Sequence, residues 1–195
     1  MAQCVGTWGD CACHPVTRDH FADRGYALQA GLTAMPDGRV LACYSVDQEI
    51  VVATRIEREV VDIFPVSLFD GGAGEDCDIE AGPGELVQLV YGEVDGADRR
   101  LVHHELDLDG NLGPASFPVT DINDNGHAPR LFVGAGGVEI VSAARFGAVG
   151  YLEHYRRAGG IWTPALVAQL PGPTVDQAVV RCGGESVVAY LALDT

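Results

Sequence analysis

The sequence predicts an all-β repeat protein made of short strands and tight turns. Four segments of similar pattern follow one another at even spacing, and no stretch shows helical periodicity. Glycine accounts for 25 of the 195 residues, and glycine adopts the positive φ of tight turns without a Cβ penalty. Together these observations predict one β-propeller domain over residues 1–195, with about four blades of four strands each.

Each repeat starts with a short apolar strand, a glycine-containing turn and a second strand that ends in Tyr or Ala. These hairpins span residues 32–44, 78–91, 131–143 and 178–190. Their turn glycines are spaced by 46, 53 and 47 residues: Gly38, Gly84, Gly137 and Gly184. The spacing sets repeats at about 26–70, 76–120, 127–170 and 174–195, preceded by an N-terminal strand within 1–16.

Two further apolar runs follow each of the first three hairpins. The third runs cover 50–57, 101–108 and 151–157, and the fourth cover 62–69, 113–120 and 163–170. Four strands joined by Gly, Asp-Gly and Pro turns are typical of a propeller blade. A β-sandwich is the main alternative, but it does not require such even self-similarity.

The stretch 127–167, HAPRLFVGAGGVEIVSAARFGAVGYLEHYRRAGGIWTPALV, carries the clearest blade pattern. It resembles blades of bacterial propellers of the sialidase-like type and of lectin propellers. That resemblance implies a fold that recognises glycans or proteins. The complete Asp-box S-x-D-x-G-x-x-W is absent, and Gly160-Ile161-Trp162 matches only its end. Because the arginine triad and nucleophilic Tyr of a sialidase also have no counterparts, the resemblance does not extend to glycosidase activity.

The last repeat supplies two strands, so the last blade is incomplete. The segment Val5–Trp8 resembles Gly159–Trp162, which precedes an outer strand. The N-terminal strand could therefore complete the last blade within one chain and protect two open sheet edges. Alternatively, two chains could join head to tail in a larger ring, as a homodimer.

The charge balance disfavours polyanionic partners. The chain has 28 acidic and 12 basic residues, all of the latter Arg, and a net charge of −16. Nucleic acids and anionic membranes need a basic patch, and the pairs Arg99-Arg100 and Arg156-Arg157 are expected to be solvated strand ends. No apolar run approaches the ~18 residues of a membrane span. Residues 1–25 lack the basic start and apolar stretch of a signal peptide, and localisation is not indicated.

The six cysteines leave three alternatives open. They lie at positions 4, 11, 13, 43, 77 and 182. Disulfides and buried thiols are both compatible with that even count. Cys11, Cys13 and His14, with Cys4 and His20 nearby, could also ligate a soft metal ion.

A calcium loop is predicted at Asp121, Asn123 and Asn125. These residues, followed by Gly126, match the D-x-[DN]-x-[DN]-G start of a loop whose oxygens converge on Ca²⁺. The twelfth position of the motif is Phe132 instead of the Glu of a complete calcium loop. An Asn- and Asp-rich turn between two blades would have the same sequence. The similar run 107–111 is expected to be a hairpin turn.

Two histidines occupy equivalent positions on the third strands of their repeats, His104 and His154. A histidine that recurs at the same position of two repeats is expected to pack in the core or at an interface between blades, with its ring hydrogen-bonded. Strand alternation places His104 on the core face and His103 and Glu105 on the solvent face.

Polar residues near the starts of the innermost strands form the candidate ligand mouth. They are Tyr26, Asp78, His127, Arg130 and Asp176. Carboxylates, a guanidinium and an aromatic ring suit hydrogen bonding to a polar ligand such as a sugar, although ordinary strand-end polarity gives the same set.

No catalytic constellation is evident, and the carboxylates of Asp76 and Asp78 would need a measured separation before acid–base work could be assigned. The sequence therefore favours a non-catalytic binding module for a glycan or protein. A structural or assembly component is the first alternative, and a glycoside hydrolase or polysaccharide lyase is the second.

Overall fold

The computed structural model describes the backbone of residues 2–5, 12–15, 30–46, 49–56, 59–66, 73–95, 98–109, 111–119, 125–134, 136–146, 149–170, 174–182 and 185–192. Side chains are described at residues 30–45, 50, 66, 74–94, 99–109, 111–119, 127–134, 136–143 and 149–170. Nearly all of this part of the chain is β-strand or the turns between strands.

The described strands follow one another along the chain. The first half contains β1 (Ala2–Val5), β2 (Ala12–Pro15), β3 (Ala30–Ala34), β4 (Val40–Val46), β5 (Glu49–Ile56), β6 (Glu59–Val66), β7 (Ala73–Ala81), the 3₁₀ turn η3 (Pro83–Glu85), β8 (Val87–Asp95) and β9 (Asp98–Leu106). The second half contains β10 (Asn125–Gly134), β11 (Gly137–Phe146), β12 (Val149–Ala158), β13 (Ile161–Leu170), β14 (Thr174–Cys182) and β15 (Glu185–Ala192).

The strands form antiparallel sheets in which each strand pairs with the next one along the chain. The orders are β1-β2, β3-β4-β5-β6, β7-β8-β9, β10-β11-β12-β13 and β14-β15. The β7–β9 sheet is extended by two isolated bridges, His103 to Ser116 and Leu106 to Leu112, at the place where a fourth strand was predicted. The expectation of an all-β chain is confirmed, while the number of blades and the closure of a ring stay predictions.

Local chemistry explains the first hairpin turn. The N–H of Gly38 donates to the Met35 carbonyl over 3.0 Å, and the N–H of Met35 donates to the Arg39 carbonyl over 2.8 Å. Gly38 has a φ of +90°, a conformation that L side chains rarely adopt. The Asp37 carboxylate accepts the Arg39 N–H over 3.0 Å, which closes the turn. The glycine predicted to make this turn therefore does so.

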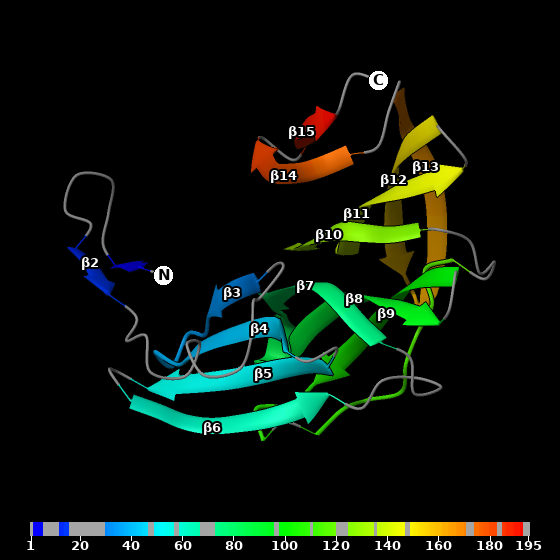
Figure 1. The fold of residues 1–195 in the computed structure, drawn as a ribbon. Helices are drawn as coiled ribbons and strands as arrows, with labels where there is room; N and C mark the ends of the chain where they lie inside the picture. The colour runs from blue at the N-terminus through cyan, green and yellow to red at the C-terminus, as the bar shows by residue number, and fades with distance from the viewer. Residues whose placement is uncertain are drawn as a thin grey trace.

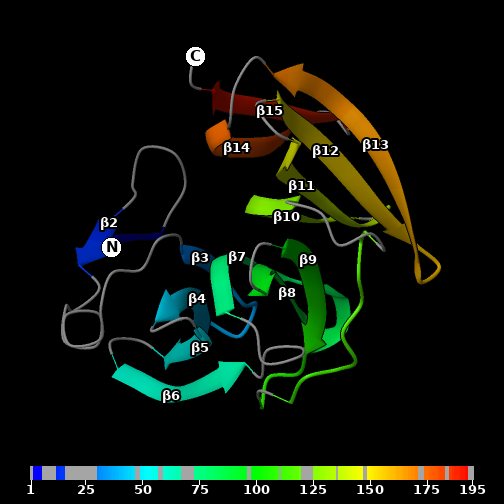
Figure 2. The ribbon, with the colours of Figure 1, turned by 45° about the vertical axis from the view of Figure 1, so that its right-hand side comes forward.

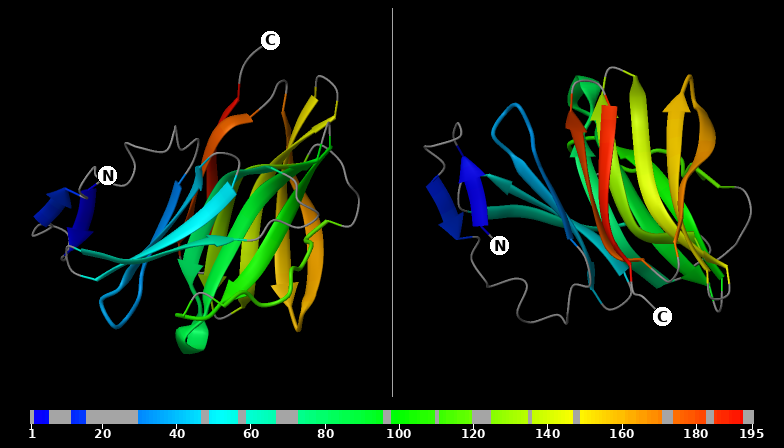
Figure 3. Two further views of the ribbon diagram at one scale, coloured as in Figure 1. Left: turned by 60° about the horizontal axis from the view of Figure 1, so that its bottom comes forward. Right: turned by 90° about the horizontal axis from the view of Figure 1, so that it is seen from above.

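The four sheets from β3 to β15 pack face to face along an arc (Figures 1 and 2). Strand β3 packs on β7, β7 on β10 and β10 on β14, so the first strand of each sheet lies on the inner side of the arc. The approach of β3 to β7 is close, because a Cβ on Gly31 would lie 2.7 Å from the Asp78 Cα. Seen from above, the β1–β2 hairpin and the β10–β13 sheet lie on opposite sides of the molecule (Figure 3).

Apolar layers fill the spaces between the sheets. The layer between β3–β6 and β7–β9 includes Leu41, Ile50, Ile79, Leu89 and Val102. A second layer joins β7–β9 to β10–β13 through Val90, Leu101, Leu131, Ile140 and Tyr155. A third cluster, Val141, Leu152 and Leu170, lies on the other face of β10–β13.

Because the β7–β9 sheet is covered on both faces, two expectations about its surface are wrong. His103 was expected to face solvent, but it is 1% exposed, since β10–β13 packs on the face that alternation assigned to water. Arg99 and Arg100 were expected to be solvated, but their side chains are 10% and 14% exposed and are paired with carboxylates. Within the described residues, no helix has the length and apolarity needed to cross a membrane.

Candidate functional site

Two facing β-bulges mark the inner strands near their starts. The pairing register shifts between Glu75 and Cys77 in β7 and between His127 and Arg130 in β10. The bulged residues, Asp76 and Ala128, both have a φ of +45° although neither is glycine. Such a conformation is unfavourable by roughly 1–2 kcal/mol per residue. Bulges also redirect the side chains beside them.

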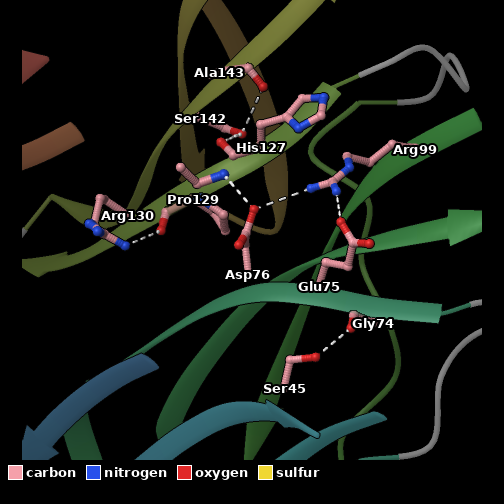
Figure 4. Close-up of polar contacts among 11 residues, drawn as sticks. Ser45, Gly74, Glu75, Asp76, Arg99, His127, Pro129, Arg130, Ser142 and Ala143 are labelled. Carbon is pink, nitrogen blue, oxygen red and sulfur yellow. Dashed lines mark hydrogen bonds and ion pairs between the residues drawn. The ribbon is translucent and has the colours of Figure 1, made fainter. Parts of the chain in front are cut away.

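Hydrogen bonds join the two bulges. The Asp76 Oδ2 accepts the Ala128 N–H over 3.2 Å and the Arg99 Nη1–H over 3.3 Å. The second terminal nitrogen of the guanidinium, Nη2, pairs with the carboxylate of Glu75. Figure 4 shows the Asp76 carboxylate between β7 and β10, with Arg99 reaching it from β9. Arg99 therefore pairs with both carboxylates at the bulge of β7.

A second carboxylate ties the same two strands together. The Asp78 Oδ2 accepts the Leu131 N–H over 2.8 Å, and its Oδ1 accepts the Ile79 N–H over 3.0 Å. Burial raises the pKa of Asp78, while the Leu131 N–H and the charge of Arg130 oppose that rise. Burial, followed by the charge of Asp78, also raises the pKa of Glu80. In the described structure, Asp78 thus has an inter-strand role.

His127 and Arg130 flank the bulge of β10 and are both half-buried. The Ser142 hydroxyl from β11 donates to the His127 carbonyl over 3.2 Å, which holds the backbone there. The Arg130 Nη1 donates to the Pro129 carbonyl over 3.3 Å. In Figure 4 the two side chains point away from each other along β10. The Ser142 hydroxyl is within hydrogen-bond distance of two backbone carbonyls, those of His127 and Ala143.

The structure brings together three of the five residues predicted for the ligand mouth. Asp78 lies on β7, and His127 and Arg130 lie on the adjacent strand β10. Asp176 lies on β14, directly after a register shift, and its side chain is outside the described residues. Tyr26 is also outside the described residues.

Sequence reasoning missed Arg99 as part of this region. Two adjacent arginines at the start of a strand are usually solvated, and nothing in the local pattern of β9 indicates otherwise. The residues that bury Arg99 lie on another strand. Glu75 and Asp76 are adjacent carboxylates at a bulge that the sequence pattern does not predict. Only the sheet register brings the guanidinium beside them.

A separate polar chain crosses the interface between β7–β9 and β10–β13. Trp162 Nε1 donates to the Ser116 hydroxyl over 3.3 Å, and Ser116 lies 2.9 Å from His103 Nδ1. His103 Nε2 lies 2.8 Å from Gln88 Oε1, an acceptor, so the ring proton of neutral His103 is on Nε2. The Trp162 ring meets His103 edge-on, with centroids 5.2 Å apart.

Burial lowers the pKa of His103 to about 3, and the charges of Arg157 and His104 act in the same direction. His103 is therefore neutral at physiological pH. This network joins the β7–β9 and β10–β13 sheets.

The two repeat-equivalent histidines have different partners. The His104 ring is 6% exposed and stacks on Tyr91 with a centroid separation of 5.9 Å. Its Nδ1 donates to the Gly113 carbonyl over 3.0 Å, and the Tyr91 hydroxyl is 3.3 Å from its Nε2. His154 Nε2 lies 3.2 Å from Glu139 Oε2. His104 is thus a hydrogen-bonded core residue, as alternation predicted.

The opposite end of the β7–β9 sheet carries a hollow of about 330 Å³. Its lining comes from the β3–β4 turn, the η3 turn and residues 107–109. Asp107 accepts the N–H groups of Asp109 and Asn111 over 3.0 and 2.8 Å, so this run forms the predicted turn. Arg39 is held by Asp37 at 2.6 Å. Two of the charged side chains that line the hollow therefore stabilise turns.

One of the three alternatives for cysteine is realised in the core. Cys43 of β4 and Cys77 of β7 form a disulfide between neighbouring sheets, with Cα atoms 6.2 Å apart. In the β1–β2 hairpin, Cys4 lies opposite Cys13 in the register. Within the described ranges, no group of three or more His, Cys, Asp and Glu side chains is placed to hold a metal ion.

The predicted calcium loop lies mostly outside the described residues. Asp121 and Asn123 are among the undescribed residues, and Asn125 begins β10. Calcium binding there stays a prediction. Millimolar Ca²⁺ should raise the melting temperature, because a ligand that binds only the native state stabilises it. Asp121→Ala should remove that rise, and a wild-type protein without any calcium-dependent shift would leave the loop as a turn.

Comparison with known proteins gives a distant structural similarity. No protein-family model matches the chain, and no curated protein matches it. Among solved structures, it is similar to the WD40 domain of SCAP from fission yeast, with a TM-score of 0.46 and 11% identity. The similarity covers 82% of this chain and 37% of that chain. A TM-score below 0.5 carries no argument about function, and this neighbour is not a sialidase-like propeller.

Proposed function

We propose that this chain is a non-catalytic binding module whose ligand contacts the bulged starts of β7 and β10. The observation that supports the proposal is the pair of facing non-glycine residues with positive φ, Asp76 and Ala128. Strained backbone persists only where surrounding contacts maintain it, and it is concentrated at ligand sites. Here Arg99 and the Ala128 N–H maintain it through the Asp76 carboxylate.

The chemistry of this region favours a protein ligand over a glycan. Its described side chains are mostly charged or polar, with Arg130 and His127 on β10 and the carboxylates of Glu75 and Asp76, which share Arg99, on β7. Charged groups arranged in this way select a partner of complementary charge. The chain's net charge of −16 would also steer basic partners toward it over longer distances. We therefore propose a peptide segment that carries both basic and acidic side chains.

A peptide-display selection against the intact chain tests the proposal. Arg130→Ala should weaken binding of selected peptides by about 10- to 100-fold, the effect of losing a charged hydrogen bond worth about 1.5–3 kcal/mol. His127→Ala should weaken it less, because an imidazole offers two ring nitrogens for hydrogen bonds whereas a guanidinium offers five N–H donors. Arg39→Ala is the matched control, since Arg39 lies on the β3–β4 turn, at the other end of the sheets. Equal effects of Arg130→Ala and Arg39→Ala would contradict the proposed site.

Parallel screens separate the remaining functions. Binding on a glycan array, with no selected peptide, would replace the protein ligand with a glycan in the lectin-propeller manner. Turnover of chromogenic glycosides would replace the binding module with a glycoside hydrolase. Absence of binding and turnover in all three screens would favour a structural or assembly component.

A further inference from the structure

Strand β4 holds β7 at two points, one on each side of the bulge at Asp76. Before the bulge in sequence, the Ser45 hydroxyl donates to the Gly74 carbonyl over 2.8 Å. After the bulge, Cys43 is linked to Cys77 by the disulfide. Ser45 and Cys43 are buried and lie two residues apart on β4, so both point to the face that packs on β7. These two contacts form the β4 clamp.

The β4 clamp matches the bulge in register. Gly74 is paired with Glu93 of β8. Cys77, three residues later, is paired with Tyr91, which is only two residues from Glu93 and therefore lies on the same face of the sheet. The extra residue, Asp76, thus brings positions 74 and 77 to one face. In a regular strand, residues three apart point to opposite faces, and only one of the two positions would face β4.

The carboxylates that flank Cys77 in sequence reach the opposite neighbour, β10. The Asp76 carboxylate accepts the Ala128 N–H over 3.2 Å. The Asp78 carboxylate accepts the Leu131 N–H over 2.8 Å. Figure 4 shows the first contact of the β4 clamp on one side of β7 and the Asp76 carboxylate on the other side. A segment of three residues therefore connects the β3–β6 sheet to the β10–β13 sheet.

We propose that the β4 clamp positions the ligand-binding region, with Cys43 and Ser45 as its positioning residues. This inference rests on the proposed function, which places the ligand at the bulged starts of β7 and β10. The φ of +45° at Asp76 is unfavourable in a non-glycine residue and persists only where contacts hold it. Without the clamp, β7 can return to a regular register on β8. A slip of one residue turns side chains to the opposite face and takes carboxylates of β7 away from β10.

The β4 clamp thereby sets the fraction of molecules that are competent to bind. The apparent dissociation constant equals the intrinsic constant divided by that fraction. A non-glycine residue that nothing holds in the left-handed conformation populates it about 5- to 30-fold less than a regular one. Because the bonds from Asp76 to Ala128 and Arg99 remain, we expect loss of the clamp to weaken binding by the lower of these factors, about fivefold.

The amide proton resonances of Ala128 and Leu131 test this positioning without any ligand. A hydrogen bond to a carboxylate is short and strong, and it moves the resonance of the donor proton downfield. Asp76→Ala and Asp78→Ala remove the two acceptors and give the reference positions of the unbonded amides. The resonances report on folded molecules alone, so a lower overall stability does not move them.

Three variants of the intact chain are compared by NMR. Replacement of Cys43 and Cys77 by alanine, the disulfide variant, should move both resonances most of the way to the reference positions. Ser45→Ala should move them in the same direction, and it keeps the clamp testable where the disulfide variant does not fold. Leu152→Ala is the matched control, because it removes a fully buried side chain from the other face of the β10–β13 sheet. It should lower stability and leave both resonances in place.

Two results would overturn the positioning. Wild-type resonances in a folded disulfide variant would mean that the disulfide stabilises the fold without setting the bulge. Wild-type resonances in Ser45→Ala would mean that the hydroxyl is not part of a clamp. Equal movement in Leu152→Ala and the disulfide variant would also contradict the proposal, because any loss of packing would then have the same effect.

The consequence for binding is measured with a peptide that is selected by display against the intact chain and is weakened by Arg130→Ala. The disulfide variant should bind this peptide about fivefold more weakly at a temperature where it is fully folded, and Leu152→Ala should bind it like the wild type. Unchanged affinity in a variant with displaced resonances would overturn the link between the β4 clamp and the ligand. Failure to select any such peptide would count against the proposed function alone, because the amide resonances decide the positioning with no ligand present.

Discussion

His103 should make the stability of this protein fall steeply below pH 6.5. The buried imidazole has its pKa lowered from 6.5 to about 3. In the unfolded chain it binds a proton as the pH falls through about 6.5, whereas in the native protein it stays neutral until about pH 3. The stability contributed by neutral His103 is thus complete above pH 6.5 and is lost as the pH falls toward 3. Each pH unit in this window removes about 1.4 kcal/mol, or about 2 kcal/mol by pH 5.

Replacement by asparagine isolates this contribution from that of the carboxylates. His103→Asn removes the titrating group from an interface where the ring is 1% exposed and bonded to Gln88 and Ser116. At pH 7 the variant should be less stable than the wild type, by about 1–3 kcal/mol for the lost hydrogen bonds. Because only the wild type loses the imidazole contribution in acid, the difference between the two should shrink by about 2 kcal/mol between pH 7 and pH 5.

Urea unfolding at pH 7, 6 and 5, followed by far-UV circular dichroism, measures this difference. Ser116→Ala is the matched control, since it removes a partner of His103 and keeps the imidazole. It should lower stability by about 1 kcal/mol and retain the wild-type pH dependence. A constant difference between wild type and His103→Asn across the three pH values would refute a buried neutral imidazole.

Three further perturbations test contacts within and between the inner strands. Replacing Cys43 and Cys77 by serine should lower the free energy of unfolding by about 4 kcal/mol, since the disulfide closes a loop of 34 residues; a urea midpoint insensitive to reductant would contradict this link. Asp76→Ala should cost about 1–3 kcal/mol by removing the acceptor of the Ala128 N–H. Asp76→Asn, which keeps an acceptor oxygen, should cost less, and equal losses would count against that bond. Ala128→Gly should raise the melting temperature by relieving its φ of +45°, whereas Ala165→Gly, in an exposed strand, should lower it.

Much of the local structure follows from short-range chemistry. Alternating apolar residues predict strands because neighbouring side chains in a strand point to opposite faces. Glycine between two such runs predicts a turn, and Gly38, Gly84 and Gly137 have φ values of +90°, +69° and +114°. The strand runs 50–57 and 101–108 overlap β5 and β9 for the same reason. These features depend on residues within a few positions of one another, so the sequence alone shows them.

Burial and pairing, by contrast, depend on which sheet packs on which. Alternation marks one face of β9 as apolar and the other as polar, and it therefore assigned His103 to water. The β10–β13 sheet covers that second face and turns a polar residue into part of a buried hydrogen-bonded chain. The same long-range packing selected the Cys43–Cys77 pair from six cysteines and set Arg99 beside Glu75. The backbone strain at Asp76 and Ala128 also has no local signal, because contacts between two repeats, 52 residues apart in sequence, hold it in place.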